Sequence, residues 1–146
     1  MPLWHIYTPV DAYSADDKKA FAAALTRRYV EHGEMPKFYV NVLFHEIAAE
    51  NVLVGGEPRN NFVRLVATHI ARRLPTPESR RRWMQICEEA IAPFVKERGY
   101  DWEMHIDEKP LELWQVQGLI PPPQRSEAEK LWLAKNKPVP YDTVET

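Results

Sequence analysis

The sequence predicts an α+β fold in which two tandem β-α-β units form one four-stranded sheet, with two helices on one face and a short C-terminal helix. Three observations predict it. A strand, a helix and a strand open the chain, the same order returns about sixty residues later, and a proline-rich segment then leads to one more helix. We expect a single domain over residues 1–146, with the first unit and its connection at 2–61, the second unit at 62–120 and a C-terminal segment at 121–146.

The first unit begins almost at the first residue. Residues 3–8 alternate between two sides of the chain, as in a strand. Ser14 and Asp17 have the spacing of a capping box, and Gly33 marks the end of the helix that they begin. That helix has a single apolar stripe, formed by Phe21, Leu25 and Tyr29. Residues 38–45 are rich in β-branched and aromatic side chains and predict the second strand, so the helix is the crossover between two parallel strands.

The second unit repeats this order. The turn-rich connection at residues 51–61 suits a short hairpin, and residues 62–70 predict the next strand. Thr76 caps a helix that we expect to reach Gly99, with a kink at Pro93. The buried stripe of this helix is formed by Trp83, Cys87, Ile91 and Phe94 or Val95. The returning strand is then predicted at residues 102–107.

The C-terminal segment has a different composition. Three prolines at 121–123 predict an extended stretch, and Ser126 with Glu129 has the spacing of another capping box. Leu131 and Trp132 then lie on the short terminal helix, and we expect the tail from Lys137 to lie over a surface.

Right-handed crossovers place both helices on the same face of the sheet and leave the other face uncovered. We expect Tyr7, Phe38, Val40 and Phe62 on that uncovered face. Because these side chains are too apolar to remain in water, a symmetric oligomer is expected to bury them.

Composition excludes several classes of function. A formal net charge of -2 gives no electrostatic reason for binding nucleic acid. The chain has one cysteine, so no intrachain disulfide forms, and it has neither a secretory signal nor an apolar run long enough to cross a membrane. We therefore expect a cytoplasmic protein. The five histidines show no metal-ligand spacing, so neither a metal nor a cofactor is expected.

Several short stretches resemble a known family. They are Met1-Pro2, Ala24-Leu25-Thr26, residues 38–42, Phe44-His45-Glu46, Asn51-Val52-Leu53-Val54-Gly55-Gly56, and Trp102, Pro110 and Gly118 nearer the end. Two β-α-β units that begin at a proline directly after the initiator methionine resemble the tautomerase superfamily, and most closely its cis-3-chloroacrylic acid dehalogenase-like group. The resemblance implies a homotrimer. It also implies a catalytic N-terminal proline, which acts as a base in tautomerases and as an acid in dehalogenases and hydratases.

Chemical grounds also favour Pro2 as the catalyst. A small second residue normally permits removal of Met1, which leaves a rigid secondary amine. An α-amino group has a reference pKa of about 7.7–8.0, and a modest downward shift makes it a base near neutral pH. The resemblance places the substrate-binding arginines at Arg72 and Arg73. Either one can lower the pKa of Pro2 and bind a substrate carboxylate, and the register between them stays open.

The sequence also departs from the dehalogenases. Tyr29 stands where they have a helix histidine, and His105 stands where they have a tyrosine on the last strand. Tyr29 is either a pocket donor or a packed aromatic, and His105 is either functional or a structural histidine. The water-activating glutamate of the dehalogenases falls near Val116 in this chain. Because the addition of water needs a positioned general base, this loss favours proton transfer over hydrolytic chemistry.

The sequence therefore predicts a tautomerase that interconverts the keto and enol forms of small 2-oxo acids. Pro2 moves the proton, with Tyr29 and His105 as further catalytic candidates. Arg72 or Arg73 binds the carboxylate, and Trp114 folds over the mouth of the pocket. Two alternatives remain: a non-catalytic binding or interaction protein with the same fold, and a cis-3-chloroacrylic acid dehalogenase or hydratase-like lyase.

Overall fold

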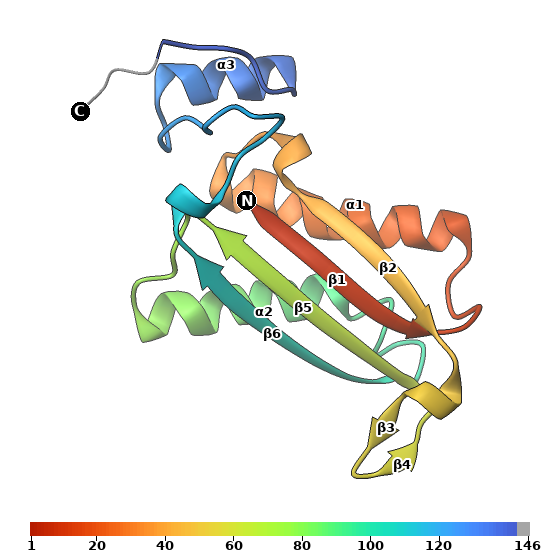
Figure 1. The fold of residues 1–146 in the computed structure, drawn as a ribbon. Coiled ribbons are helices and arrows are strands. Elements are labelled where there is room, and N and C mark those ends of the chain that lie inside the picture. The colour runs from red at the N-terminus through yellow and green to blue at the C-terminus, as the bar shows by residue number, and fades with distance from the viewer. Residues whose placement is uncertain (143–146) are drawn as a thin grey trace.

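The computed structural model describes residues 1–142, which form a four-stranded sheet, three α-helices and a small hairpin (Figure 1). The strands are β1 Pro2–Pro9, β2 Asn41–Ile47, β3 Leu53–Val54, β4 Glu57–Pro58, β5 Phe62–Ile70 and β6 Asp101–Lys109. The α-helices are α1 Ala15–Gly33, α2 Pro77–Ile91 and α3 Glu127–Lys135. Short 3-10 turns occur at η1 Lys37–Tyr39, η2 Ala49–Asn51 and η3 Leu111–Leu113.

The four long strands are ordered β2-β1-β5-β6. β1 pairs in parallel with β2, β5 pairs in parallel with β6, and the two central strands β1 and β5 are antiparallel. Each outer strand therefore follows its central strand through a crossover helix, and Figure 1 shows α1 and α2 together on one side of the sheet. The predicted tandem β-α-β architecture, with its short C-terminal helix, is confirmed.

The core lies between the sheet and these two helices. Strand alternation buries Trp4 and Ile6 of β1 together with Val63 and Leu65 of β5, all four at 0% exposure. The helices contribute their apolar stripes, namely Phe21, Leu25 and Tyr29 from α1 and Trp83, Cys87, Ala90 and Ile91 from α2. The predicted stripes therefore face the sheet.

The helix starts follow from local hydrogen bonding. At α1 the Ser14 hydroxyl accepts from the Asp17 N–H, and the Asp17 carboxylate accepts from the Ser14 N–H. At α2 Thr76 forms the same reciprocal pair with Ser79, and Pro77 occupies the first helical position. These bonds satisfy backbone donors that a helix otherwise leaves unpaired at its start.

The predicted continuation of the second helix to Gly99 was wrong. Helix α2 ends at Ile91, two residues before Pro93, and the chain continues in irregular turns. In these turns the Glu97 and Tyr100 N–H groups donate to carbonyls five residues back. Proline has no N–H to donate and its ring crowds the preceding turn, so it ended the helix here instead of kinking it.

The predicted strand at residues 38–45 starts later, at Asn41, because residues 37–39 form the η1 turn. Phe38 consequently lies against Trp132 of α3, with ring centroids 5.8 Å apart, and Val40 packs against the core. Our placement of Phe38 and Val40 on the uncovered sheet face was wrong, since the η1 turn removes both from that face. Tyr7 does lie on it, stacked on His45 at 4.8 Å.

The C-terminal segment lies over the end of the sheet where β1 begins (Figure 1). The Ser126 hydroxyl caps α3 by accepting from the Glu129 N–H, as predicted. The reciprocal half of the capping box is absent, because the Glu129 carboxylate binds Arg72 and the Arg125 N–H instead. After α3, the Trp132 indole donates to the Val139 carbonyl. The predicted surface course of the tail is therefore seen up to residue 142, and residues 143–146 lie outside the described part.

Within residues 1–142 no helix is both long and apolar enough to span a bilayer. The same residues contain no group of three or more histidine, cysteine or acidic side chains arranged to bind a metal ion.

Candidate active site at the amino terminus

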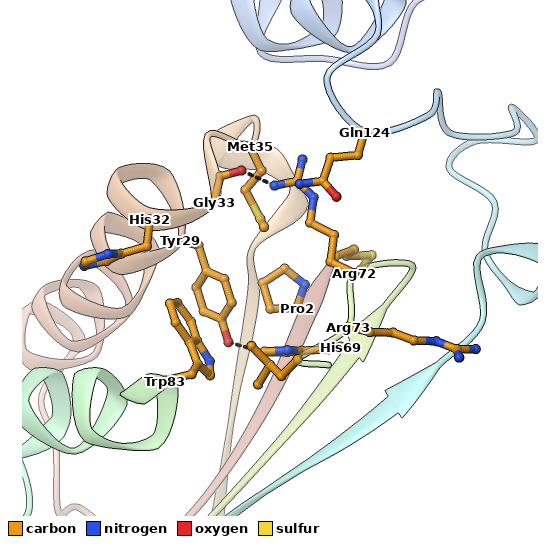
Figure 2. Close-up of a pocket in the computed structure, with 12 residues that line it drawn as sticks. Pro2, Tyr29, His32, Gly33, Met35, His69, Arg72, Arg73, Trp83 and Gln124 are labelled. Carbon is orange, nitrogen blue, oxygen red and sulfur yellow. Dashed lines mark hydrogen bonds between the residues drawn. The ribbon is translucent and has the colours of Figure 1, made fainter. Parts of the chain in front are cut away.

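A cavity of about 200 Å³ opens beside the amino terminus, where β1 begins and β5 ends (Figure 2). Its walls come from both β-α-β units: Pro2, Tyr29, His32, Gly33 and Met35 from the first, and His69, Arg72, Arg73, Leu74 and Trp83 from the second. Met1 and Gln124 complete the lining. The antiparallel pairing of β1 with β5 explains this meeting, because it sets Pro2 directly opposite His69.

Met1 extends the sheet by one residue. Its amino group donates to the Ile70 carbonyl at 2.5 Å, and its own carbonyl accepts from the Ile70 N–H at 2.8 Å. Burial and then the Arg72 guanidinium lower the pKa of this amino group from 8.0 to about 5, against an opposing effect of Glu129. The Met1 amino group is therefore largely uncharged at neutral pH.

Arg72 and Arg73 differ in position. The Arg72 guanidinium donates to the Gly33 carbonyl and to Glu129 Oε1, the latter at 2.6 Å, and its side chain is 16% exposed. A Cβ at Gly33 would lie 3.3 Å from this guanidinium, so the glycine permits the close approach. Arg73 is exposed, and Figure 2 shows its guanidinium directed away from Pro2. Of the two, Arg72 has its charge at the cavity.

Tyr29 lines the cavity and takes part in a buried hydrogen-bond chain. The Trp4 indole donates to the Tyr29 oxygen at 3.0 Å, and that oxygen lies 2.7 Å from His69 Nε2. Burial raises the pKa of Tyr29 well above 10.0. Burial and then the nearby amino terminus lower the pKa of His69 from 6.5 to about 4. Both groups are therefore neutral over the physiological range.

Two further cavities, of about 260 and 60 Å³, also contain Met1 in their walls. Trp114 lines both of these and is absent from the wall of the first, so its place over the mouth of the pocket stays a prediction. It packs edge-on against Tyr39 with ring centroids 4.9 Å apart. The Tyr39 hydroxyl is buried without a hydrogen-bond partner among residues 1–142.

His105 does not reach the cavity within the chain. It lies in the middle of β6 on the uncovered face of the sheet, where its Nδ1 is 2.7 Å from Arg64 and its Nε2 is 3.5 Å from Asp107. Of the six residues selected from sequence, four line the cavity of Figure 2: Pro2, Tyr29, Arg72 and Arg73.

Sequence reasoning missed two residues at the site, His69 and Glu129. His69 could have been found, because it continues the alternation of Val63, Leu65 and Ala67 on the buried face of β5. Glu129 gave no such signal, since its partner Arg72 lies 57 residues away in the chain.

Comparisons with known proteins agree with this fold. The Tautomerase_3 family, described as "Putative oxalocrotonate tautomerase enzyme", matches residues 1–137. No curated protein matches the chain. Native RhCC from Rhodococcus jostii RHA1 is 51% identical with a TM-score of 0.93, and the match covers 95% of this chain and 99% of RhCC.

Two other solved structures extend the comparison. A protein described as "a probable enzyme" from the thermophilic fungus Aspergillus fumigatus is 36% identical with a TM-score of 0.90, over 97% of this chain and 98% of its own. N1, a member of the cis-3-chloroacrylic acid dehalogenase family, shares the fold at 16% identity, with a TM-score of 0.71 over 90% of each chain. With a family match over residues 1–137 and a relative half identical along nearly its whole length, the chain belongs to the tautomerase superfamily.

Proposed function

We propose that this protein is a tautomerase in which the Pro2 nitrogen, freed by removal of Met1, moves a proton between oxygen and carbon of a small 2-oxo acid. The observation that carries the proposal is the environment of the amino terminus. The Met1 amine at this position is buried and lies beside an arginine, and its pKa is lowered to about 5. The same surroundings would favour an uncharged Pro2 amine, which is an available base at neutral pH.

Removal of Met1 would change this site in two ways. It would vacate the volume that borders all three cavities, directly beside the new amine of Pro2. It would also release the Ile70 N–H and carbonyl from their partners. Because Pro2 is itself buried at the same end of β1, we expect Arg72 and the burial that remains to lower the pKa of its amine, in the same direction as that of Met1.

The reaction can be written with atoms and charges in balance. The enol form of the 2-oxo acid gives its hydroxyl proton to the neutral Pro2 nitrogen, which becomes cationic while the substrate becomes an enolate. The enolate then takes the same proton at its C3 carbon, and the keto form leaves with Pro2 neutral again. Arg72 would bind the substrate carboxylate with the guanidinium N–H groups that Gly33 and Glu129 do not use.

The test is ketonisation of phenylenolpyruvate by processed protein, with mass spectrometry to establish that Met1 is absent. Pro2→Ala still permits removal of Met1 but lacks the rigid secondary amine, and we expect its kcat/KM to fall about 100-fold. Pro9→Ala, at the other end of β1, is the control and should keep the parent rate. A Pro2→Ala variant as active as the parent would exclude proline catalysis.

The lyase alternative needs a carboxylate free to activate water. Glu129 is buried beside the amino terminus, but Arg72 binds its Oε1 and the Arg125 N–H binds its Oε2. This engagement supports tautomerisation over hydration or dehalogenation. Release of halide from cis-3-chloroacrylate at a rate comparable with ketonisation would reverse that preference.

The Arg72–Glu129 pair also favours one further candidate, a binding protein without turnover. Glu129 already neutralises the cation that a substrate carboxylate would need. Retention of Met1 in the native protein, with slow or absent ketonisation, would support that function.

We also propose that three copies assemble and that the protein acts in the cytoplasm. The uncovered sheet face supports assembly, because it carries Leu43 and the stacked rings of His5, Tyr7 and His45.

A further inference from the structure

The hydrogen-bond chain Trp4–Tyr29–His69 has a fixed direction. An indole N–H only donates, so the Tyr29 oxygen accepts from Trp4. The Tyr29 hydroxyl proton has one acceptor among the described residues, His69 Nε2 at 2.7 Å. A proton on His69 Nε2 would leave the Tyr29 hydroxyl proton without an acceptor among the described residues, whereas donation from Tyr29 to His69 pairs it. On this ground Tyr29 is the donor.

This direction fixes the tautomer of His69. A ring nitrogen that accepts a hydrogen bond carries no proton, and a neutral imidazole then has its single proton on the other nitrogen. His69 is neutral at physiological pH, since burial holds its pKa near 4. The proton of the ring is therefore on Nδ1.

The Nδ1–H group has no partner within the described chain. His69 forms part of the cavity wall beside Pro2, its partner in the pairing of β1 with β5, and no hydrogen bond joins its Nδ1 to any group in residues 1–142. Figure 2 shows the ring next to Pro2, with the Tyr29 hydroxyl at its edge. Trp83 packs across both Tyr29 and His69, at centroid distances of 4.8 and 6.0 Å, and limits movement of the two rings.

We propose that His69 Nδ1–H is the hydrogen-bond donor to the substrate's 2-oxygen, and that Trp4 and Tyr29 are positioning residues that fix its tautomer. The inference rests on the proposed function. A 2-oxo acid has its carboxylate next to the 2-oxygen and C3 on the other side, which matches Arg72, His69 and Pro2 around one cavity.

The neutral state of the donor suits the reaction. During proton transfer the 2-oxygen becomes an enolate oxygen, and a fixed N–H donor stabilises the negative charge that develops there. A neutral imidazole does this without giving up a proton, whereas an imidazolium would protonate the enolate oxygen and so compete with the delivery of a proton from Pro2 to C3. The specificity that follows is for substrates with an oxygen acceptor adjacent to the carboxylate.

The tautomer can be measured without turnover. In processed protein labelled with ¹⁵N-histidine, we expect His69 Nδ1 to have the shift of a protonated nitrogen and Nε2 that of an unprotonated one, throughout the neutral range. Tyr29→Phe removes the hydroxyl that donates to His69 Nε2, and both tautomers of His69 should then be populated. A protonated Nε2 in the parent protein would overturn the proposal.

Kinetics with two amide variants separate the effect of losing the hydrogen-bond donor from the effect of changing the volume of the side chain. Asparagine places its amide N–H groups near the position of Nδ1, whereas glutamine extends toward the position of Nε2. We expect His69→Gln to lower kcat about 100-fold with little change in KM, because the carboxylate contact remains. His69→Asn should retain most of the parent kcat.

The outcomes separate this inference from the proposed function. Equal losses in folded His69→Asn and His69→Gln would overturn the role of the donor. So would parent activity in His69→Gln, and that result would leave proline catalysis intact if Pro2→Ala were inactive. Parent activity in Pro2→Ala would instead remove the proposed function itself, while the tautomer measurement would still stand.

Discussion

Arg72 and its partner Glu129 have opposite effects on the amino terminus. The Arg72 guanidinium lowers the pKa of the amino terminus, whereas Glu129, which binds that guanidinium, raises it. A substrate carboxylate would enter this balance as a second anion near the same cation. The charges around Arg72 therefore determine both the pKa of the amine and the affinity for a substrate acid.

Replacing Arg72 should alter binding and pH dependence together. We expect Arg72→Gln to raise KM for a 2-oxo acid at least tenfold, since a charged hydrogen bond is worth about 1.5–3 kcal/mol. Loss of the cation also removes one cause that lowers the pKa of the amine. That pKa then rises, and the acidic limb of the pH–rate profile moves to higher pH.

The matched control is Arg73→Gln, because Arg73 is adjacent in sequence but its guanidinium is directed away from Pro2. It should change KM less than twofold. Equal effects of the two replacements on initial-rate kinetics would contradict the assignment of the carboxylate to Arg72.

His69 should make folding stability depend on pH. Its pKa is about 4 in the folded protein and 6.5 in a model compound, so the unfolded chain binds more protons between those values. The free energy of unfolding should therefore fall as pH decreases from about 6.5 to about 4, by about 3 kcal/mol from this group. It should not fall further from this cause below pH about 4.

The measurement is urea denaturation at several pH values, for the parent and for His69→Asn. Other groups titrate in both proteins, so the difference between the two curves isolates the histidine. Parallel curves over the acidic range would show that His69 titrates normally in the folded state.

At the scale of elements, α3 is attached to the sheet through the buried Arg72–Glu129 pair, with side chains 16% and 6% exposed. Glu129→Ala leaves a buried guanidinium without its counter-ion, and we expect a loss of about 3–5 kcal/mol. Glu127→Ala breaks a pair on the same helix whose acidic side chain is 88% exposed, and it should have little effect. Thermal unfolding of both variants tests this, and equal melting temperatures would refute the docking role.

The sequence predicted those elements whose signals are local. Ser14 with Asp17, Thr76 with Pro77, and the apolar stripes all act within one or two turns, and the structure contains them. Glu129 shows the limit. The spacing from Ser126 predicted a reciprocal cap, but a cation 57 residues away binds the carboxylate more strongly than one backbone N–H.

The same reasoning applies to the site. Pro2, Tyr29 and Arg72 could be placed from motif positions and periodicity, and they meet at one cavity. The role of His69 depends on the antiparallel register of β1 with β5, which pairs two residues 67 positions apart, and no local pattern specifies that register.

At the scale of the whole molecule, the uncovered sheet face is mixed in character. Along β1 and β2 it carries Leu43 beside the hydrogen-bonded pair of His5 and His45, at 2.8 Å. Along β5 and β6 it carries an ion pair of Arg64 and Glu103 at 2.9 Å. Packing of the neighbouring copies against this face would bury its apolar part, and its charged part would then face polar or oppositely charged groups of a neighbour.

Two leucines of equal exposure test this assembly. Leu43, 46% exposed, lies on the uncovered sheet face, and Leu133, 45% exposed, lies on α3. We expect the parent protein to sediment at three times the chain mass of 17.1 kDa. Leu43→Arg should shift the protein toward the single-chain mass, because the new cations of neighbouring copies would be buried together and desolvated. Leu133→Arg should sediment like the parent, and dissociation caused equally by both substitutions would show that surface charge in general, and not this face, controls assembly.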